Sequence, residues 1–267
     1  MILTMLFWLA SVLTTVGAYC VWSELSLWWI LPIQLGAFVA WIALYLLILL
    51  IASFFLSVKQ PVDHPKKICR FFIVFTMDCL TRLLRCRITL RGAEKIPEGP
   101  CVLVSNHRSA MDPITTLVAL KNRPLVFIAK DSTLKFPIVG PFIHHAGFHA
   151  IDRGNGMRAL RTLKHAAGIM QSEGLDMGIY PEGTRSRTGK LLEFKTGAFL
   201  LAKRAGAPMV ILSTKGTEVV LRRFPWRSTR VELTVLEVLS PEEIKERSME
   251  ELCDHVRSVI AKDLREE

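Results

Sequence analysis

Charge is almost absent from the start of this 267-residue chain, because residues 1–57 contain Glu24 as their one charged side chain. Such a stretch cannot supply the solvated surface of a water-soluble domain. Residues 1–22 and about 28–56 are apolar, and each is long enough to cross a hydrocarbon core of roughly 30 Å at about 1.5 Å per helical residue. The sequence therefore predicts a membrane-anchoring helical hairpin over residues 1–57.

The features of a cleaved signal peptide are also missing. The first apolar segment has no basic start and no convincing small-x-small cleavage site, and a second apolar segment follows at once. Retained anchors are favoured over a signal peptide. Basic residues cluster after the second segment, and such residues hold a flank in the cytoplasm: Lys59, Lys66, Lys67 and Arg70. We therefore expect an integral protein of the inner (cytoplasmic) membrane, with its main domain on the cytoplasmic face.

Signatures of several other protein classes are lacking. The six cysteines show no paired spacing, which favours reduced thiols over a disulfide framework. His144, His145 and His149 have no carboxylate that completes a ligand set, so we expect core or pocket histidines and no metal. No Gly-x-Ser-x-Gly elbow surrounds Ser109, which argues against a serine nucleophile.

Positive charge is abundant outside the apolar segment. The chain carries +10, and since residues 1–57 contribute one negative charge, the remainder carries +11. A basic region beside a membrane segment favours anionic lipid headgroups, and no motif supports nucleic acid as the partner. The alternative is that stretches such as Arg222–Arg223 and Arg227–Arg230 are ordinary solvated charges.

The most informative motif is Asn106-His107-Arg108-Ser109-Ala110-Met111-Asp112, which lies between an apolar strand pattern and a helix start. A carboxylate can accept from one ring nitrogen of His107 while the other nitrogen takes a proton from a substrate hydroxyl. The alternative is that Asp112, which precedes Pro113, is a helix N-cap. Spacing alone leaves the two interpretations open.

Two further blocks follow the first, each after a short apolar run: Phe148-His149-Ala150-Ile151-Asp152-Arg153 and Tyr180-Pro181-Glu182-Gly183-Thr184-Arg185-Ser186-Arg187. In order and spacing, the three blocks resemble those of the glycerophospholipid acyltransferase family over about residues 85–215. The resemblance implies direct transfer of an acyl chain from acyl-CoA or acyl-carrier protein to the sn-2 hydroxyl of lysophosphatidate. His107 would be the general base, Asp112 its orienting group, and no metal or bound cofactor is required.

The resemblance also implies a phosphate site. Arg153 and Arg185 match the family's phosphate-binding positions, and guanidinium groups suit phosphate oxygens because they bind them bidentately. Lys130 resembles a third family element that reaches the same phosphate, with a surface lysine as the alternative. Gly183 permits a tight turn and close ligand approach. Glu182 would bind acceptor hydroxyls or pair with a nearby arginine.

Alternating strand and helix patterns predict an α/β fold whose mixed sheet is covered by helices on both faces. We expect strands at 88–90, 102–105, 126–129, 177–180, 210–214 and 231–238, and helices at 113–121, 131–139, 156–173, 195–205 and 241–264. This gives a hairpin (1–57), a linker with an amphipathic helix (58–86) and an acyltransferase domain (87–267). The amphipathic segment 68–85 could lie on the membrane or pack on the domain.

Two other functions remain open. The chain could acylate another lysolipid, in which case dependence on the phosphate would be lost. It could also be a non-catalytic membrane protein that binds anionic lipid through its basic surface, with Asp112 acting as a cap.

Overall fold

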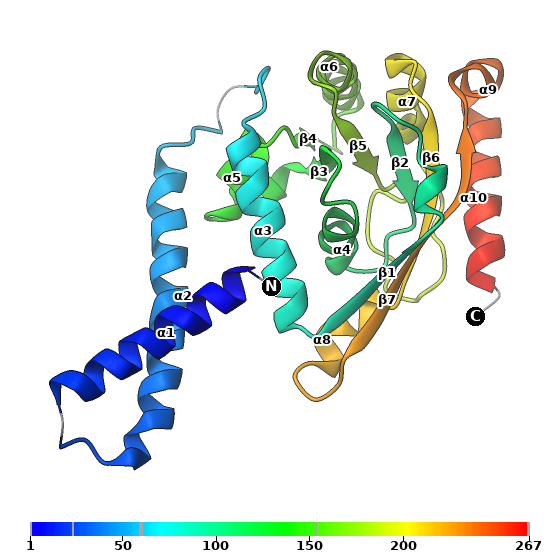
Figure 1. The fold of residues 1–267 in the computed structure, drawn as a ribbon. Coiled ribbons are helices and arrows are strands. Elements are labelled where there is room, and N and C mark those ends of the chain that lie inside the picture. Colours follow the sequence, from blue (N-terminus) through cyan, green and yellow to red (C-terminus); the bar gives the residue numbers. More distant parts are fainter. Residues whose placement is uncertain (1, 23, 59–60, 153, 266–267) are drawn as a thin grey trace. The chain divides into compact units, whose positions relative to one another are not determined.

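The structure is a computed structural model that describes residues 2–22, 24–58, 61–152 and 154–265. Two compact units make up the chain, residues 1–59 and 60–267. The first unit holds the two N-terminal helices, and the second holds the sheet and the remaining helices (Figure 1).

The first unit is a pair of contacting helices, α1 (Ile2–Val21) and α2 (Ile30–Phe54), with a short 3-10 helix η1 (Leu27–Trp29) before α2. Their contact is polar as well as apolar. Gln34 Nε2 donates to Ser11 Oγ over 2.6 Å, and Thr15 Oγ1 donates to Gln34 Oε1 over 2.9 Å. Such bonds are favourable between helices that have no water around them. Among the described residues, one helical stretch, residues 27–54, is long and apolar enough to cross a membrane, and the apolar helix at residues 5–21 is shorter.

A seven-stranded mixed sheet forms the second unit, which confirms the predicted fold class. Its order is β1-β7-β6-β2-β5-β3-β4, and all neighbouring strands are parallel except β6 and β7. The central strands β2 and β5 are buried along their whole length, because both of their faces are covered. The strands are β1 (Cys86–Arg91), β2 (Val102–Ser105), β3 (Leu125–Lys130), β4 (His149–Ile151), β5 (Asp176–Ile179), β6 (Met209–Lys215) and β7 (Thr229–Leu239).

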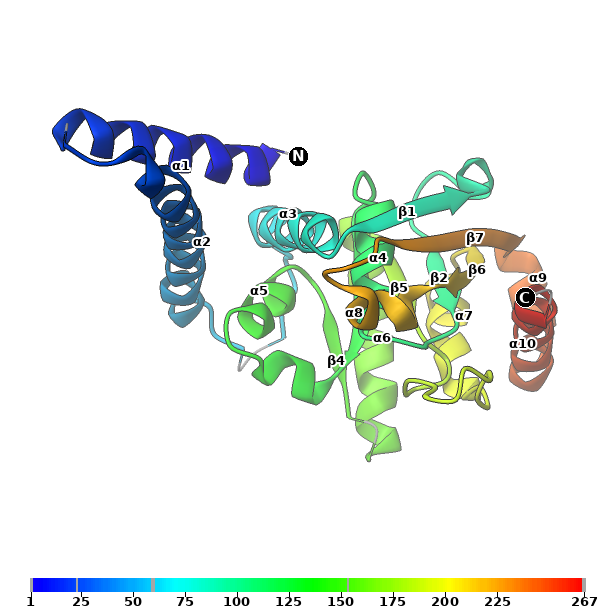
Figure 2. The same ribbon diagram turned by 90° about the horizontal axis from the view of Figure 1, so that it is seen from below.

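Helices cover both faces of this sheet, with α3 and α4 on one side and α6, α7 and α10 on the other (Figure 2). The helices are α3 (Lys67–Leu83), α4 (Met111–Ala119), α5 (Val139–His145), α6 (Gly156–Glu173), α7 (Leu200–Ala205), α8 (Val220–Arg223), α9 (Pro241–Glu246) and α10 (Met249–Arg265). The 3-10 helices are η2 (Ala93–Lys95), η3 (Asp131–Lys135), η4 (Thr196–Phe199) and η5 (Thr217–Val219).

Three predicted helices were wrong in extent. The segment 195–205 is the 3-10 helix η4 followed by the shorter helix α7. The segment 131–139 holds the 3-10 helix η3 and the first residue of α5, because Ile138 has φ +64°, which no α-helix can contain. The segment 241–264 is two helices. Ser248 begins the second with a capping box, in which its Oγ accepts from Glu251 N and its own N donates to Glu251 Oε2.

The amphipathic helix α3 packs on the domain and also exposes part of its apolar surface. It contacts α4, α5 and β1, and it buries Cys69 and Ile73. On its other side Ile68, Phe71 and Leu83 are each more than half exposed. The two roles considered for this segment therefore do not exclude each other.

A buried ion pair closes the amino ends of the central strands. Asp176 is 1% exposed and accepts from Arg123 Nε over 2.5 Å and from Cys101 N over 3.1 Å. Arg123 also donates to the carbonyls of Pro97 and Gly99. This pair holds the amino ends of β2, β3 and β5 together. The loops at the opposite, carboxyl ends of these strands are therefore free to form a ligand site.

A chain of hydrogen bonds through His149 and His165 connects the segment before α3 to the rest of the second unit. His149 donates from Nδ1 to Gly147 O over 2.9 Å, and its Nε2 bonds His165 Nδ1 over 3.2 Å. His165 Nε2 in turn bonds Asp63 Oδ1 over 2.9 Å. Burial, with the neighbouring His165, lowers the pKa of His149 from its usual 6.5 to about 4. Because of this lowered pKa, His149 is neutral in the folded chain near neutral pH.

This lowered pKa predicts a loss of stability in acid. Between pH 6.5 and about pH 4 the unfolded chain binds a proton at His149 that the folded chain does not bind, so stability falls as the pH falls. From pH 7.5 to pH 5 the loss should be roughly 2 kcal/mol. His149→Asn, which retains a donor for Gly147 O, should remove this part of the pH dependence in thermal unfolding of the detergent-purified chain. His255→Asn is the matched control, and an unchanged pH profile of His149→Asn would contradict the assignment.

Candidate active site

The candidate site forms where three parallel neighbouring strands end at the same edge of the sheet. Strands β2 and β5 pair in parallel, as do β2 and β6, so the loops that follow Ser105, Ile179 and Lys215 meet there. The motif of His107 is on the first loop and that of Glu182 on the second. The carboxyl edge of a parallel sheet is the usual place for ligands.

Asn106 fixes the start of the first loop. Its side chain is 1% exposed, its Nδ2 donates to Thr214 O over 2.9 Å, and its Oδ1 accepts from Thr214 N over 2.8 Å. The amide thus continues the pairing of β2 with β6 by one position beyond Ser105. His107 consequently leaves the sheet from a rigid point.

His107 and Asp112 form the predicted pair, with His107 Nδ1 and Asp112 Oδ2 2.8 Å apart. Asp112 is fully buried, and its Oδ2 also accepts from Arg108 N and Ser109 N, each over 2.7 Å. Its Oδ1 accepts from the Thr217 hydroxyl. The carboxylate therefore binds the loop that carries the histidine.

The capping interpretation does not describe this carboxylate. Ala110 occupies the N-cap position of α4, and Asp112 lies inside the helix. The two backbone N–H groups that bond Asp112 belong to residues before the helix, whereas an N-cap binds those of the first turn. Asp112 thus orders the 107–109 turn around the imidazole.

The bond to Asp112 also sets the chemistry of the imidazole. Because Asp112 accepts, Nδ1 carries the proton, and Nε2 is left with its lone pair as a base. The ring stacks on Tyr180, with centroids 4.3 Å apart, and Tyr180 stacks on Phe127. Burial raises the pKa of Tyr180 well above its usual value, so the phenol stays neutral beside the imidazole. The His107 side chain is 15% exposed and thus reachable.

Glu182 holds backbone in place. Its Oε1 accepts from His107 N over 2.6 Å and its Oε2 from Leu192 N over 3.0 Å, and the residue is 3% exposed. Burial raises its pKa, and the two N–H bonds counter that effect in part. Both carboxylate oxygens thus bind backbone, and among the described residues no arginine pairs with Glu182.

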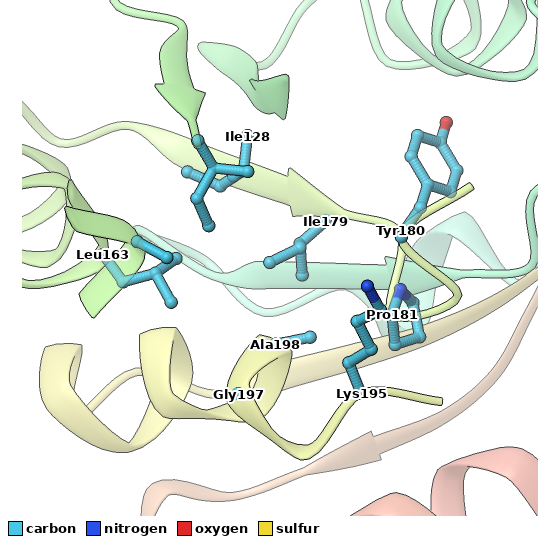
Figure 3. Close-up of a pocket in the computed structure, with 11 residues that line it drawn as sticks. Ile128, Leu163, Ile179, Tyr180, Pro181, Lys195, Gly197 and Ala198 are labelled. Atoms are coloured by element: carbon cyan, nitrogen blue, oxygen red, sulfur yellow. The ribbon is translucent and has the colours of Figure 1, made fainter. Parts of the chain in front are cut away.

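A cavity of about 180 Å³ opens beside this loop (Figure 3). Gly183, at φ +66°, and Lys195 are among its lining residues, and a Cβ on Gly183 would lie 3.1 Å from Lys195 Cε. The lysine side chain points toward Pro181 in this view. The interior is apolar and is lined by Ile128, Ile151, Ala159, Leu163, Ile179 and Ala198.

The three cations predicted to bind phosphate are in different situations. Arg185 is exposed. The next residue, Ser186, is hydrogen-bonded to the backbone of the His107–Asp112 pair, since Ser186 N donates to His107 O over 2.8 Å. Lys130 is exposed at the carboxyl end of β3, on the same edge of the sheet. Arg153 lies outside the described residues.

Sequence reasoning gave no role to three residues of this region: Tyr180, which stacks on His107, Thr217, which bonds Asp112, and Lys195, which lines the cavity. The backbone brings Thr217 to Asp112 because the preceding Gly216 makes a tight turn, with φ +84°. Only glycine fits at this position, since a Cβ would lie 2.3 Å from Arg230 O in β7. The Lys-Gly-Thr sequence at the end of β6 is the one local sign of this turn, and it carries no sign of a bond to Asp112.

Comparison with known proteins shows that this chain is similar to acyltransferases. A family model described as Acyltransferase matches residues 87–215. The crystal structure of the 1-acyl-sn-glycerophosphate (LPA) acyltransferase PlsC from Thermotoga maritima superposes with a TM-score of 0.61 at 27% identity, covering 84% of this chain and 88% of that one.

Curated relatives give the family. The 1-acyl-sn-glycerol-3-phosphate acyltransferase of Escherichia coli K12 is 31% identical over 173 residues, which is 63% of this chain and 68% of the relative. An enzyme of the same name from Chlamydomonas reinhardtii is 30% identical over 207 residues, 76% of this chain and 60% of the relative. The chain belongs to the 1-acyl-sn-glycerol-3-phosphate acyltransferase family. It spans 60% of the length of the relatives from Chlamydomonas reinhardtii and Limnanthes douglasii.

The position of Glu182 predicts a stability role. In Glu182→Gln one acceptor oxygen becomes an NH₂ group that faces a backbone N–H, which should cost roughly 1 to 3 kcal/mol. The midpoint of thermal unfolding should fall by several degrees, whereas the exposed control Glu193→Gln should unfold like the native chain. A fully stable Glu182→Gln would mean that the carboxylate is free to bind a ligand.

Proposed function

We propose that this protein transfers an acyl chain from acyl-CoA or acyl-carrier protein to the sn-2 hydroxyl of lysophosphatidate, giving phosphatidate. The observation that carries the proposal is the His107–Asp112 pair, in which a buried carboxylate bonds Nδ1 and leaves Nε2 with its lone pair on a side chain that is 15% exposed. The family of the chain gives the reaction class that such a base serves.

In the proposed reaction, Nε2 of His107 takes the proton of the sn-2 hydroxyl as its oxygen attacks the thioester carbonyl. Asp112 stabilises the imidazolium that forms. Collapse of the tetrahedral intermediate breaks the carbon–sulfur bond, and the imidazolium returns its proton to the departing thiolate. The step balances without a metal, a bound cofactor or a covalent enzyme intermediate.

Substrate roles follow from charge and burial around the pair. Arg153, Arg185 and Lys130 would bind the phosphate of the acceptor, and the exposed Arg185 is well placed because its neighbour Ser186 bonds the backbone of His107. The apolar cavity beside Tyr180 suits an alkyl chain. Glu182 and Gly183 would shape the loop between these two regions, with Glu182 acting through the backbone of His107.

The proposed setting is the inner face of the cytoplasmic membrane, where lysophosphatidate lies. The apolar stretch 27–54 and the excess of basic residues after it support this location. A second candidate is acylation of another lysolipid. Arg185 is exposed, and no acidic side chain among the described residues pairs with it, so its guanidinium group is not held in a geometry that admits one headgroup alone.

The first test concerns the base. His107→Ala should lower kcat at least 100-fold, because general base catalysis contributes about 10² to 10⁴ in rate. Asp112→Asn should also be severe, since an amide cannot offset an imidazolium. Rates are measured with lysophosphatidate and both donor types in detergent micelles. The matched control is Asp176→Asn, a buried carboxylate at the opposite edge, which should lose stability and keep its rate per folded molecule. Turnover by His107→Ala near the native rate would refute the proposal.

The second test asks whether arginine binds phosphate. Arg185→Ala or Arg153→Ala should lower kcat/KM for lysophosphatidate by roughly 1.5 to 3 kcal/mol, the value of a charge-assisted hydrogen bond. Arg185→Lys should recover part of this loss, and the KM of the donor should change little. Monoacylglycerol, which lacks the phosphate, should be a poor acceptor that loses little further in these variants. Equal losses for both acceptors would mean that the arginines shape the pocket and do not bind the phosphate. The control variant is Arg204→Ala on α7, which should leave both rates unchanged.

A further inference from the structure

The segment after Thr217 forms an exposed tip at the carboxyl edge of the sheet. It consists of residues 221–227, the end of α8 and the turn that follows, and we refer to it as the 221–227 tip. Leu221 is 63% and Trp226 84% exposed. The other five tryptophans of the chain all lie in residues 1–57, so Trp226 is the single tryptophan of the second unit. Leu221 and Trp226 are thus the large apolar side chains that the tip exposes to a partner.

The fold holds this tip rigidly. Arg85 Nη1 donates to Pro225 O over 2.9 Å, and Arg227 N donates to Arg223 O over 2.8 Å. Beneath it Val220 is fully buried, and Phe224 packs on the cluster that contains Val220 and Leu84. The exposure of Trp226 is therefore set by the packed core below it and needs no loop to be ordered on binding.

Positive charge surrounds the two apolar side chains. Four exposed arginines lie within or next to the tip, Arg222, Arg223, Arg227 and Arg230, against one acid in the same stretch, Glu218. None of these arginines forms an ion pair with a carboxylate among the described residues. Their guanidinium groups are thus available to an anionic partner.

Apolar surface is also exposed at the end of α3. Leu83, at the end of that helix, is 55% exposed, and Arg85, two residues on, bonds the tip at Pro225. The tip is also tied to the catalytic pair, because Thr217, four residues before Leu221, bonds Asp112. The tip and the site therefore share one edge of the domain.

We propose that the 221–227 tip docks the domain on an anionic bilayer, with Trp226 and Leu221 in the headgroup region and the arginines on lipid phosphates. Tryptophan is enriched at this depth because its ring is apolar and its N–H is polar, and arginine beside it meets the phosphate layer. Docking would turn the carboxyl edge of the sheet toward the membrane. This orientation rests on the proposed function, since it brings His107 to a lipid acceptor.

A bilayer fits the tip better than a second copy of the chain. A two-fold contact between copies would bring the same four arginines face to face, where like charges repel. A fluid anionic surface offers phosphates to all four arginines at once and an apolar layer to the two side chains between them.

The experiment measures where the ring of Trp226 lies in the full-length chain. The native chain and Trp226→Phe are reconstituted in phosphatidylcholine vesicles with roughly 30% phosphatidylglycerol, with and without brominated acyl chains. The difference between their emission spectra isolates Trp226, and bromolipid should quench that difference at least twofold. A difference spectrum that is unquenched by bromolipid and fully quenched by aqueous iodide would overturn the proposal. Because no turnover is measured, this outcome is independent of the proposed reaction.

Charge is tested in the same assay. The triple variant Arg222→Gln, Arg223→Gln, Arg227→Gln should lose at least half of the Trp226 quenching. The matched control Arg204→Gln, Lys245→Gln, Lys262→Gln removes equal charge from exposed positions on α7, α9 and α10 and should retain it. Equal effects of the two triples would overturn the assignment to this tip. A Trp226 signal that depends on protein density in the vesicle and not on bromolipid would assign the tip to a contact between copies and also overturn it.

Discussion

The buried carboxylate of Asp112 is the constraint on which the rest of the site depends. A carboxylate at zero exposure is strongly unfavourable unless its oxygens are bonded, and here four donors bond it: the imidazole of His107, two backbone N–H groups and the Thr217 hydroxyl. These donors come from the loop after β2 and from η5 after β6. The need to satisfy one charge thus fixes two loops, and the bond at Nδ1 leaves Nε2 of His107 with its lone pair, which is the state that the proposed base requires.

Local patterns allowed much of the fold to be predicted. Strand β2 and helix α6 were placed to the residue, because an apolar run and a 3.6-residue period need no knowledge of distant segments. The pairing of His107 with Asp112 was predictable for the same reason, as the two residues are five positions apart. Thr217 could not be found in this way, since it is 105 residues from Asp112 and reaches it through the β6–β2 neighbourhood. Tyr180 stacks on His107 through β5, which is likewise a consequence of strand order.

Where the predictions failed, one bond or one backbone angle outweighed a periodic pattern. The apolar spacing of 241–264 continues past Arg247, and the capping box of Ser248 nevertheless starts a new helix. The role of Glu182 stayed open for a related reason. Its place in a motif left ligand binding and pairing with an arginine as alternatives, and no pattern in the sequence identifies the backbone N–H groups that its two oxygens bond. Motif membership indicated that the residue matters, and the structure shows what it contacts.

The amino and the carboxyl ends of the strands carry different kinds of interaction. At the amino edge, Asp176 and Arg123 join three strands through a bonded ion pair, whose rupture would leave a buried charge unpaired. That edge can therefore hold the strands in register while the loops at the other edge carry groups whose positions serve a ligand. Asp112 then joins that loop cluster to the 221–227 tip through Thr217. The proposed docking surface and the carboxylate that bonds His107 are thus four residues and one hydrogen bond apart, so one continuous set of bonds holds both.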